Sequence, residues 1–318
     1  MRRRSSLLTK LRLKWRRFRL GKRFHHHYQC DPRFSIARSD NAHEVLWGGK
    51  KIATVGHIKS LKQHFNGSCF IIASGPSLNE LDLAELQGFD TLSLNCAIKK
   101  FVASQSAPTH CVIVDRRIFE NNWDCVEASI RSGANCFFSY VGLSRICERA
   151  PELLKQGNIY LVESLGRFFG QPRPDLDAFL QQYQYDPDLF MDETLATNGV
   201  IGFSVNAEKG FFSGKTVATW GVQIVNYLGY NKQFIAGMDL GGTGKSHFYG
   251  ASTNKTPDFL ADYEPYIKGC FEQTRRAADT GLFSIYNLSE HSTLPHEIIP
   301  KISYDEALTL AKEDRDLT

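Results

Sequence analysis

The 318-residue sequence has no apolar run that approaches the ~20 residues of a membrane-spanning helix. None of its eight cysteines has C-x-x-C spacing, and Cys69, Cys111 and Cys136 lie in apolar, strand-like runs, so we expect reduced core thiols in a cytosolic protein. The sequence contains no zinc-ligand spacing, no Gly-x-Ser-x-Gly motif and no Cys/His nucleophile pair. The arginine-rich N-terminus lacks a continuous apolar core, so a secretory signal is not expected.

Two phosphate or metal motifs are incomplete. The run over residues 241–246 is similar to a P-loop, but Asp239 stands where that motif needs its first glycine. Asp175-Leu176-Asp177 and Asp186-Pro187-Asp188 have D-x-D spacing, yet neither directly follows a strong strand. We therefore interpret the two D-x-D stretches as exposed acidic loops. The sequence predicts neither a metal nor another cofactor.

Charge is distributed unevenly along the chain. Residues 1–24 hold eleven lysines and arginines and no acid, so the other 27 of the 38 basic residues stand against all 34 acids, a balance of −7. Within residues 5–24, apolar side chains recur at helical spacing, namely Leu7, Leu11, Trp15 and Phe18. This pattern predicts a basic amphipathic helix on an anionic membrane surface; a solvated tail, or one that touches nucleic acid, is the alternative.

The rest of the chain alternates between strands and helices. We expect a membrane-associating segment and linker over residues 1–43, in which His25-His26-His27 is incidental, and one catalytic domain over 44–318. A hairpin over 44–55 forms a small flap ahead of the repeating units. Strands are then expected at 70–73, 91–94, 110–114, 136–140, 159–162, 234–237 and 282–286, and helices at 78–86, 97–104, 125–132, 145–155, 217–228 and 258–278. The alternation predicts an α/β fold with a doubly wound, mainly parallel, Rossmann-like sheet.

Residues 165–215 interrupt this alternation. They carry prolines, Gly170 and many aromatic residues. We expect a partly ordered insertion, acting as a lid over the site.

The strand over 70–73 ends in Ser74-Gly75-Pro76-Ser77, ahead of a helical pattern. Glycine allows unusual backbone angles, proline suits a first helical turn, and serine caps free amides. Such a loop at the carboxyl end of a strand favours a phosphate or nucleotide site. The alternative is an ordinary strand–helix turn.

Other expected strands also end on short polar side chains: Ser74, Asn95, Asp115, Asp239 and Asn287. In an open parallel sheet, ligands bind outside these strand ends, so the set predicts a polar pocket. Lys209, Lys215 or Lys245 would neutralise phosphate. His247 or His291 would act as general base, each being otherwise a surface-loop histidine.

Three stretches, taken in order, carry a family resemblance: residues 71–78, Asn95, and residues 216–239. They resemble bacterial transferases that use CMP-activated nine- and eight-carbon acidic sugars, of which the sialyltransferase-like fold is one branch. The sequence is more similar to the lipopolysaccharide core Kdo (3-deoxy-manno-octulosonic acid) transferases of the WaaZ type. That similarity extends from about residue 68 to residue 303 and includes the regions of His247-Phe248-Tyr249 and residues 286–289.

The resemblance implies a glycosyltransferase that moves Kdo from CMP-Kdo to the lipopolysaccharide inner core at the cytoplasmic face of the bacterial inner membrane. It implies CMP-sugar contacts from Gly75, Pro76, Ser77 and Asn95, nucleotide contacts from Ser213, Gly214 and Asp239, and a phosphate contact from Tyr249. CMP leaves with one phosphate, so a metal is not obligatory, and no nucleic-acid partner is expected.

The general base remains open between two histidines. The His-Ser pair of the sialyltransferase branch lies farther after the aspartate than His247 does, whereas His291-Ser292 lies later still. Two other functions are also left open. One is a pterin diphosphokinase-like enzyme of the related Gly-Pro-Ser-Leu superfamily, which would need ATP and magnesium. The other is a non-catalytic protein that binds lipopolysaccharide or nucleic acid.

Overall fold

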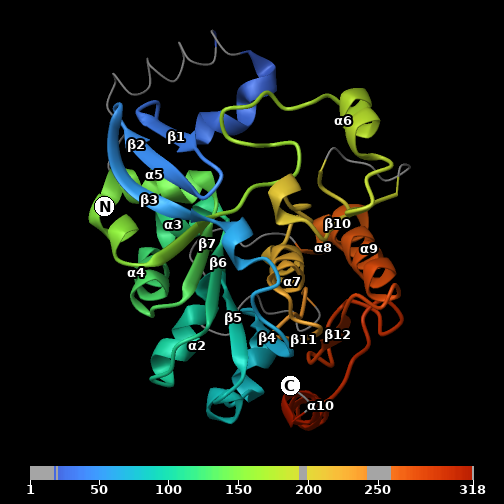
Figure 1. Cartoon of the computed structure of the whole chain (residues 1–318). Coiled ribbons are helices and arrows are strands. Elements are labelled where there is room, and N and C mark those ends of the chain that lie inside the picture. Colours follow the sequence, from blue (N-terminus) through green and yellow to red (C-terminus); the bar gives the residue numbers. More distant parts are fainter. Residues whose placement is uncertain (1–17, 19–20, 193–198, 242–258, 317–318) are drawn as a thin grey trace.

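The computed structural model describes residue 18 and residues 21–192, 199–241 and 259–316 (Figure 1). Its main sheet contains β1 (Phe34–Arg38), β2 (Ala42–Trp47), β3 (Lys50–His57), β4 (Ser68–Ile72), β5 (Asp90–Leu94), β6 (His110–Ile113), β7 (Asn135–Phe138), β8 (Asn158–Leu161), β11 (Lys232–Ala236) and β12 (Ser284–Asn287). The ten strands are ordered β1-β2-β3-β8-β7-β6-β5-β4-β11-β12. Neighbouring strands from β3 to β12 run parallel, so the predicted mainly parallel α/β sheet is confirmed.

The strand order reverses beside β4. Strands β4 to β8 extend the sheet in one direction, whereas β11 and β12 are added on the other side of β4. The β4–β11 ladder pairs Phe70 with Phe234 and Ile72 with Ala236. Ligands of doubly wound sheets bind in the crevice at such a reversal, outside the carboxyl ends of the strands. The topology therefore identifies the loops after β4 and β11 as the first place to look for a site.

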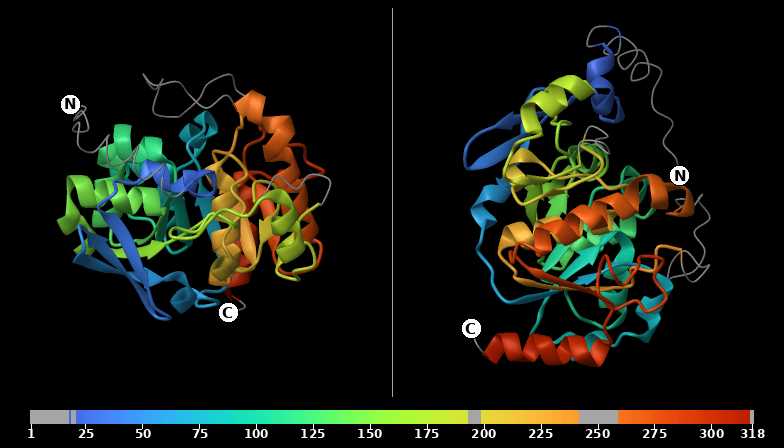
Figure 2. Two further views of the ribbon diagram at one scale, coloured as in Figure 1. Left: turned by 90° about the horizontal axis from the view of Figure 1, so that it is seen from above. Right: turned by 90° about the vertical axis from the view of Figure 1, so that its right-hand side faces the viewer.

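Helices cover both faces of the sheet (Figure 2). One core contains side chains from α2 (Ile98–Ala103), α3 (Arg116–Asn121), α4 (Trp123–Arg131), α5 (Tyr140–Arg149) and α10 (Tyr304–Asp316). The other contains side chains from α7 (Val217–Leu228) and α9 (Lys268–Ala278). Alternate residues of β4 enter the two cores, Phe70 and Ile72 the first, Cys69 and Ile71 the second. The doubly wound arrangement is confirmed, and all eight cysteines are buried and free of disulfides.

The hairpin expected over 44–55 is present as β2 and β3, but it is not a separate flap. Strand β3 joins the main sheet through parallel pairing with β8, where Gly56 lies opposite Tyr160. Strand β1, in the stretch expected to be a linker, pairs antiparallel with β2. The hairpin is therefore part of the central sheet, because alternate residues such as Val45 and Val55 are buried in the first core.

Helix α7 matches its expected bounds, and capping residues account for both ends. The Thr216 side chain accepts a hydrogen bond from the Ala218 N–H at the start. Gly229 ends the helix at φ 113°, and a Cβ there would collide with the Phe65 carbonyl. Only glycine fits this position without strain.

Two expected helices differ from the structure. Residues 78–86 form two short 3-10 turns, η3 (Pro76–Glu80) and η4 (Leu83–Leu86), because the Asp82 carboxylate caps the second turn at the Ala84 N–H (2.9 Å) and separates it from the first. The helix expected over 145–155 is α5 followed by the turn η6 (Pro151–Lys155). Ala150 leaves helical geometry there, as a residue before proline tends to do.

The insertion over 165–215 leaves and rejoins the sheet at one place. The Leu165 N–H donates to the Phe211 carbonyl (2.9 Å), and the Phe211 N–H donates to the Glu163 carbonyl (3.0 Å). Between these points lie α6 (Leu176–Tyr183), β9 (Leu189–Phe190), β10 (Phe203–Ser204) and η8 (Ala207–Lys209). A lid function for this insertion stays a prediction.

The N-terminal 3-10 helix η1 (Lys22–Gln29) lies beside the start of that insertion (Figure 1). The Arg173 N–H donates to the Arg23 carbonyl (2.8 Å), and Arg23 Nε donates back to the Arg173 carbonyl (3.1 Å). Most of the amphipathic segment expected over 5–24 lies outside the described residues. The helix expected over 258–278 consists of α8 (Phe259–Asp262), the π turn η9 (Tyr263–Ile267) and α9. Within the described part of the chain, no helix is long and apolar enough to cross a bilayer.

Candidate active site

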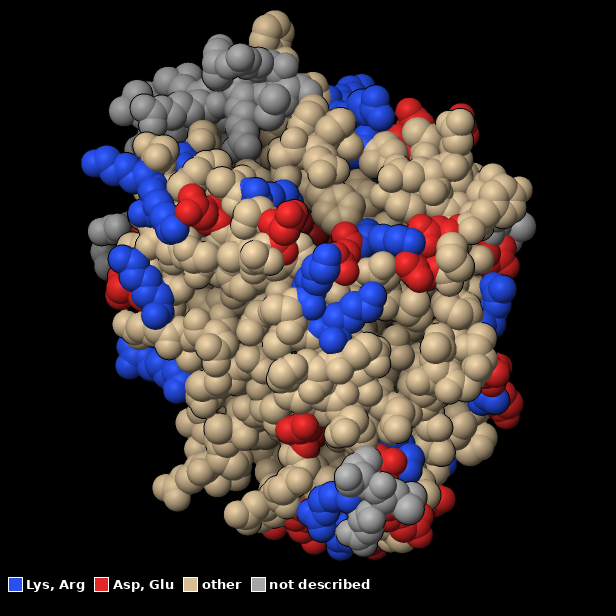
Figure 3. All heavy atoms as spheres, in the orientation of Figure 1, with Lys and Arg blue, Asp and Glu red and all other residues tan. Residues whose placement is uncertain are grey.

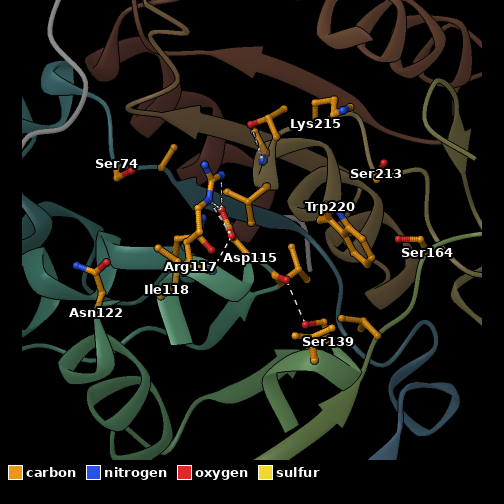
Figure 4. A pocket seen from close by; sticks show the side chains of 18 of the residues that line it. Ser74, Asp115, Arg117, Ile118, Asn122, Ser139, Ser164, Ser213, Lys215 and Trp220 are labelled. Atoms are coloured by element: carbon orange, nitrogen blue, oxygen red, sulfur yellow. Dashed lines mark hydrogen bonds and ion pairs between the residues drawn. The ribbon is translucent and has the colours of Figure 1, made fainter. Parts of the chain in front are cut away.

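A cavity of about 680 Å³ runs along the carboxyl ends of the parallel strands. Residues that follow six strands line it: Gly237–Gly241 after β11, Ser74 and Gly75 after β4, Asn95 after β5, Asp115 after β6, Ser139 after β7, and Glu163 and Ser164 after β8. Figure 4 shows several of these side chains around one space. Four of the five polar strand-end residues named from the sequence therefore meet in one crevice: Ser74, Asn95, Asp115 and Asp239.

The loops after β4 and β11 are joined at the switch point. The Gly75 N–H donates to the Gly237 carbonyl (2.8 Å), and the Ser77 N–H donates to Asp239 Oδ2 (2.9 Å). A Cβ at residue 75 would overlap both the Asp239 carboxylate and the Gly237 carbonyl. Glycine is therefore required by close packing at this junction.

One carboxylate oxygen of Asp239 is buried without a partner among the described residues. Its side chain is buried, and Oδ1 has no hydrogen-bond partner among the described residues although Asp239 lines the cavity. Buried polar atoms are nearly always satisfied, so an unpartnered acceptor in a cavity points to a ligand donor.

Asn95 shows the same feature in a strained backbone. It has φ 51°, a left-handed conformation that asparagine tolerates better than most residues. Its Oδ1 is buried without a partner, and the residue lines the cavity. Backbone strain combined with an open acceptor is typical of a ligand-binding position.

Asn287, the fifth strand-end residue, is not among the described residues that line the cavity. It supports the junction between the loops after β4 and β11. Its Oδ1 accepts the Ser289 N–H (3.0 Å), and the hydroxyls of Ser289 and Ser77 lie 3.0 Å apart. The stretches over 75–77 and 286–289 are therefore in direct contact.

Two helix N-termini face the cavity. Ser213, Lys215 and Thr216 line it at the start of α7, and Ser139 lines it at the start of α5. Free N–H groups and the helix dipole at such ends attract anions. Lys215 adds a positive charge, with its Nζ 4.7 Å from the centre of the Tyr266 ring.

The buried side chain of Gln223 fixes the stretch that carries Ser213. Its Oε1 accepts the N–H groups of Ser204 and Phe212 (3.0 Å each), and its Nε2 donates to the Phe212 and Thr219 carbonyls. All of its hydrogen-bonding capacity is used inside the core. Gln223 thus positions one wall of the cavity without lining it.

Asp115 is already paired within the cavity. It caps α3 through the Arg117 N–H (2.8 Å), and its carboxylate also binds the Arg117 guanidinium at 2.6 Å (Figure 4). The Asp115 carboxylate is therefore neutralised by Arg117, and the ion pair lies on the wall of the cavity after β6.

The end of the cavity farthest from Asp239 along the sheet order is basic. It is lined by Lys22, His25 and His26 of η1 and by Arg167 and Arg173 of the insertion. Burial lowers the pKa of Arg167, and the nearby positive charge of Arg173 acts in the same direction. Burial likewise lowers the pKa of His26, although its hydrogen bond to the Phe168 carbonyl opposes this. The histidine tract therefore reaches the cavity, in contrast to its interpretation as incidental.

The remaining residues predicted from the sequence differ in where the structure places them. Pro76 and Ser213 line the cavity, whereas Ser77 and Gly214 are not among the described lining residues, although each follows one of them in the chain. His291 is exposed and is not among the described lining residues. His247, Tyr249 and Lys245 lie outside the described residues, so no contact of theirs is stated.

Lys209, considered from the sequence as a phosphate ligand, is engaged elsewhere. Its Nζ lies 2.6 Å from Asp186 and 2.7 Å from Asp188, away from the cavity. The D-x-D motif at 186–188 is thus an ion-pair site for a lysine. Over residues 21–192, 199–241 and 261–315, no cluster of three His, Cys, Asp or Glu side chains could hold a metal ion.

Comparison with known proteins matches the same region of the chain. The family model described as 3-deoxy-D-manno-octulosonic acid transferase WaaZ matches residues 52–305. A "Probable 3-deoxy-manno-octulosonic acid transferase" of Escherichia coli K12 is 22% identical over 270 residues, covering 81% of this chain and 89% of the relative. A protein of Salmonella typhimurium LT2 with the same description is 24% identical over 247 residues, covering 75% and 87%.

Among solved structures, the MAf glycosyltransferase from Magnetospirillum magneticum AMB-1 has a TM-score of 0.44 and 13% sequence identity, covering 79% of this chain and 36% of its own. The assignment rests on the family match, which includes the junction of Gly75 with Asp239 and the whole parallel part of the sheet. The chain belongs to the WaaZ family of 3-deoxy-D-manno-octulosonic acid (Kdo) transferases and is a glycosyltransferase.

Proposed function

We propose that this glycosyltransferase takes Kdo from CMP-Kdo and attaches it to the inner core of lipopolysaccharide. The observation that carries the proposal is the junction at the switch point, where Ser77 N–H binds Asp239 Oδ2, while Oδ1 of this cavity-lining residue is buried with no hydrogen-bond partner among the described residues. A cavity of about 680 Å³ falls within the ~300–1,000 Å³ range of small-molecule sites.

The donor nucleotide would bind at the Asp239 end. Gly75 and Pro76 would pack against CMP, while Asp239 Oδ1 and Asn95 Oδ1 would accept hydrogen bonds from its hydroxyl or amino groups. The phosphate would lie near the N-terminus of α7 and Lys215, which supply N–H donors and a positive charge. Contacts from Ser77, Ser213 and Gly214 remain part of the proposal, as does a phosphate contact from Tyr249.

Transfer breaks the bond between the anomeric carbon of Kdo and the phosphate oxygen of CMP, and the electron pair leaves with that oxygen. Positive charge develops on the anomeric carbon while the acceptor hydroxyl attacks it and loses its proton. The α7 N-terminus and Lys215 would stabilise the negative charge on the leaving phosphate. A general base would take the hydroxyl proton, with His247 and His291 as the candidates named from the sequence.

The charge of residues 1–24, which hold eleven lysines and arginines and no acid, supports the proposal of a peripheral position on the cytoplasmic face of the inner membrane. Basic segments with interfacial aromatic residues bind anionic lipid surfaces. A lipid-linked acceptor would be presented at that surface.

Incubation of the purified full-length protein with CMP-Kdo and truncated core lipid tests the proposal. Mass spectrometry of the lipid should show the addition of one Kdo residue together with release of CMP. Turnover of ATP without any gain in lipid mass would support the diphosphokinase alternative. Lipid binding with neither reaction would support a non-catalytic protein.

A further inference from the structure

The basic end of the cavity consists of Lys22 and His26 from η1 together with Arg167 and Arg173 from the insertion. These residues are more than 140 positions apart in the sequence, yet two backbone-linked contacts hold them together. Arg173 and Arg23 exchange two hydrogen bonds, and His26 Nε2 lies 3.2 Å from the Phe168 carbonyl. The cluster is therefore part of the folded structure rather than a chance meeting of surface side chains.

The side chains of Arg167 and Arg173 form no hydrogen bond with the described part of the chain. Nε of Arg167 and Nε of Arg173 are shielded from solvent, and neither atom has a hydrogen-bond partner among the described residues. No salt bridge within the described part of the chain involves either guanidinium. A half-buried guanidinium without an anion is costly, so such a pair beside a cavity is typical of a site completed by a ligand.

Nearby acids are already engaged. Glu163, which also lines the cavity, lies 2.8 Å from Arg38 and accepts the Phe169 N–H at 2.7 Å. Burial raises the pKa of Glu163, and the charge of Arg38 opposes this. Asp31, which follows η1, is paired with Arg33 at 2.9 Å. These two acids therefore form their ion pairs with arginines outside the cluster.

One face of the molecule carries charges of both signs. Figure 3 shows lysines, arginines and acids interspersed over the face seen in Figure 1, with no extended area of one sign among the coloured residues.

The position of the cluster separates it from the donor end. Along the sheet order, β5, β6 and β7 lie between β4, which carries the Gly75 junction, and β8, which leads to Arg167. Neighbouring parallel strands are about 4.8 Å apart, so the two ends lie on the order of 20 Å apart. Binding of CMP to the arginine variants, measured below, tests whether the donor phosphate contacts this end.

We propose that Arg167 and Arg173, with Lys22 and His26, form a second subsite that binds an anionic group of the acceptor saccharide, a phosphate or a carboxylate. This inference rests on the proposed function for the identity of the acceptor, but the subsite itself is independent of which nucleotide sugar binds at the other end. Arginine pairs suit both anions, because a guanidinium binds their oxygens through two parallel N–H groups.

The test is equilibrium binding by calorimetry with the full-length protein and a soluble, lipid-free inner-core oligosaccharide that carries Kdo carboxylates and heptose phosphates. Arg167→Gln and Arg173→Gln should each weaken oligosaccharide binding at least about 10-fold, the loss expected for one charge-assisted hydrogen bond. The dissociation constant of CMP should change less than twofold. Arg275→Gln is the matched control, since Arg275 pairs with Asp279 on α9 away from the cavity.

Modified oligosaccharides distinguish the source of the anion. If the subsite binds phosphate, a dephosphorylated oligosaccharide should bind wild-type protein as weakly as the intact one binds the Arg173→Gln variant. If it binds carboxylate, a carboxyl-reduced oligosaccharide should do so instead. Equal binding of all forms by wild-type protein would overturn the inference.

Two further results keep the inference apart from the donor assignment and from misfolding. A parallel loss of CMP binding in both arginine variants would place the cluster in the donor site and overturn the subsite. Oligosaccharide binding that depends on both arginines, in a protein that does not bind CMP, would support the subsite and contradict the proposed function. Because the Arg167 guanidinium has no partner among the described residues, Arg167→Gln should keep or raise the midpoint of thermal unfolding; a marked fall would indicate a structural role.

Discussion

The N–H of Ser77 donates to Oδ2 of Asp239 at 2.9 Å, across 162 positions of the sequence. This bond closes the switch point of the sheet, where the loops after β4 and β11 meet. It also orients the carboxylate so that its other oxygen, which has no partner among the described residues, belongs to the wall of the cavity.

Replacing Asp239 should separate its structural bond from its ligand contact. Asp239→Asn keeps an acceptor for Ser77 N–H, so the free energy of unfolding should change by less than about 1 kcal/mol. Asp239→Ala removes the acceptor and should cost about 1–3 kcal/mol. Urea denaturation measures both. Equal stability of the two variants would show that the bond to Ser77 contributes little.

Gly75→Ala should disrupt the junction by crowding. The added Cβ would overlap the Asp239 carboxylate and the Gly237 carbonyl, which must shift at a cost of about 1–3 kcal/mol. CMP binding should weaken at least tenfold in calorimetric titrations. Gly281→Ala is the control for binding, because Gly281 has φ 84° and its replacement also strains the backbone, but the residue does not line the cavity and its Cβ meets nothing within 4 Å. Unchanged CMP affinity in Gly75→Ala would count against a donor site at this junction.

Gln223→Leu should destabilise the wall that carries Ser213. The substitution leaves the N–H groups of Ser204 and Phe212 buried without an acceptor, at a cost of about 2–4 kcal/mol in unfolding free energy. Gln156→Leu, at an exposed position, should change stability by less than about 0.5 kcal/mol. Chemical denaturation compares the two, and similar losses would contradict a specific role for the Gln223 hydrogen bonds.

Stability should fall at acid pH through His110. Burial lowers the pKa of His110 to about 4 from 6.5, and its Nε2 lies 2.9 Å from the Tyr230 hydroxyl. As pH falls from 6.5 toward 4, the unfolded chain takes up a proton at this histidine before the folded chain does. The contribution of His110 to the free energy of unfolding is therefore complete above pH 6.5 and falls by about 3 kcal/mol over this window.

Urea denaturation at several pH values measures this fall. His43 has its pKa lowered to about 4, mainly by burial, and contributes in the same window. His110→Asn should therefore flatten part of the dependence between pH 6.5 and 4. A variant with the full wild-type slope would remove His110 from the explanation.

Membrane binding should depend on the charge of the N-terminal segment. The full-length protein should sediment with vesicles that contain anionic lipid and remain in solution with neutral ones. Replacing Arg12, Arg16 and Arg19 with glutamate should abolish sedimentation, whereas replacing three lysines or arginines elsewhere should not. Sedimentation that ignores these charges would exclude the proposed electrostatic contact.

The sequence predicted most strands of the parallel sheet, because buried parallel strands are short apolar runs with a polar residue at the end. Residues such as Asn95 and Asp239 were identifiable for that reason, and both line the cavity. The helix expected over 78–86 was wrong because Asp82 caps a new turn, a local hydrogen bond that apolar spacing does not reveal.

The basic end of the cavity was missed for a different reason. It depends on contacts such as Arg23 with Arg173 and His26 with Phe168, which link η1 to an insertion far along the chain. Neither segment has a periodic pattern that predicts its partner, so the histidine tract was interpreted as part of a linker. Only the folded chain brings these residues to one cavity.

The most direct test of the central claim is a crystal structure of the full-length protein with CMP bound. We expect the nucleotide between the Gly75 turn and the N-terminus of α7, with a hydrogen bond to Asp239 Oδ1 and the phosphate facing Lys215. CMP bound outside the cavity, or in it without contact to either the Gly75 turn or Asp239, would contradict the account.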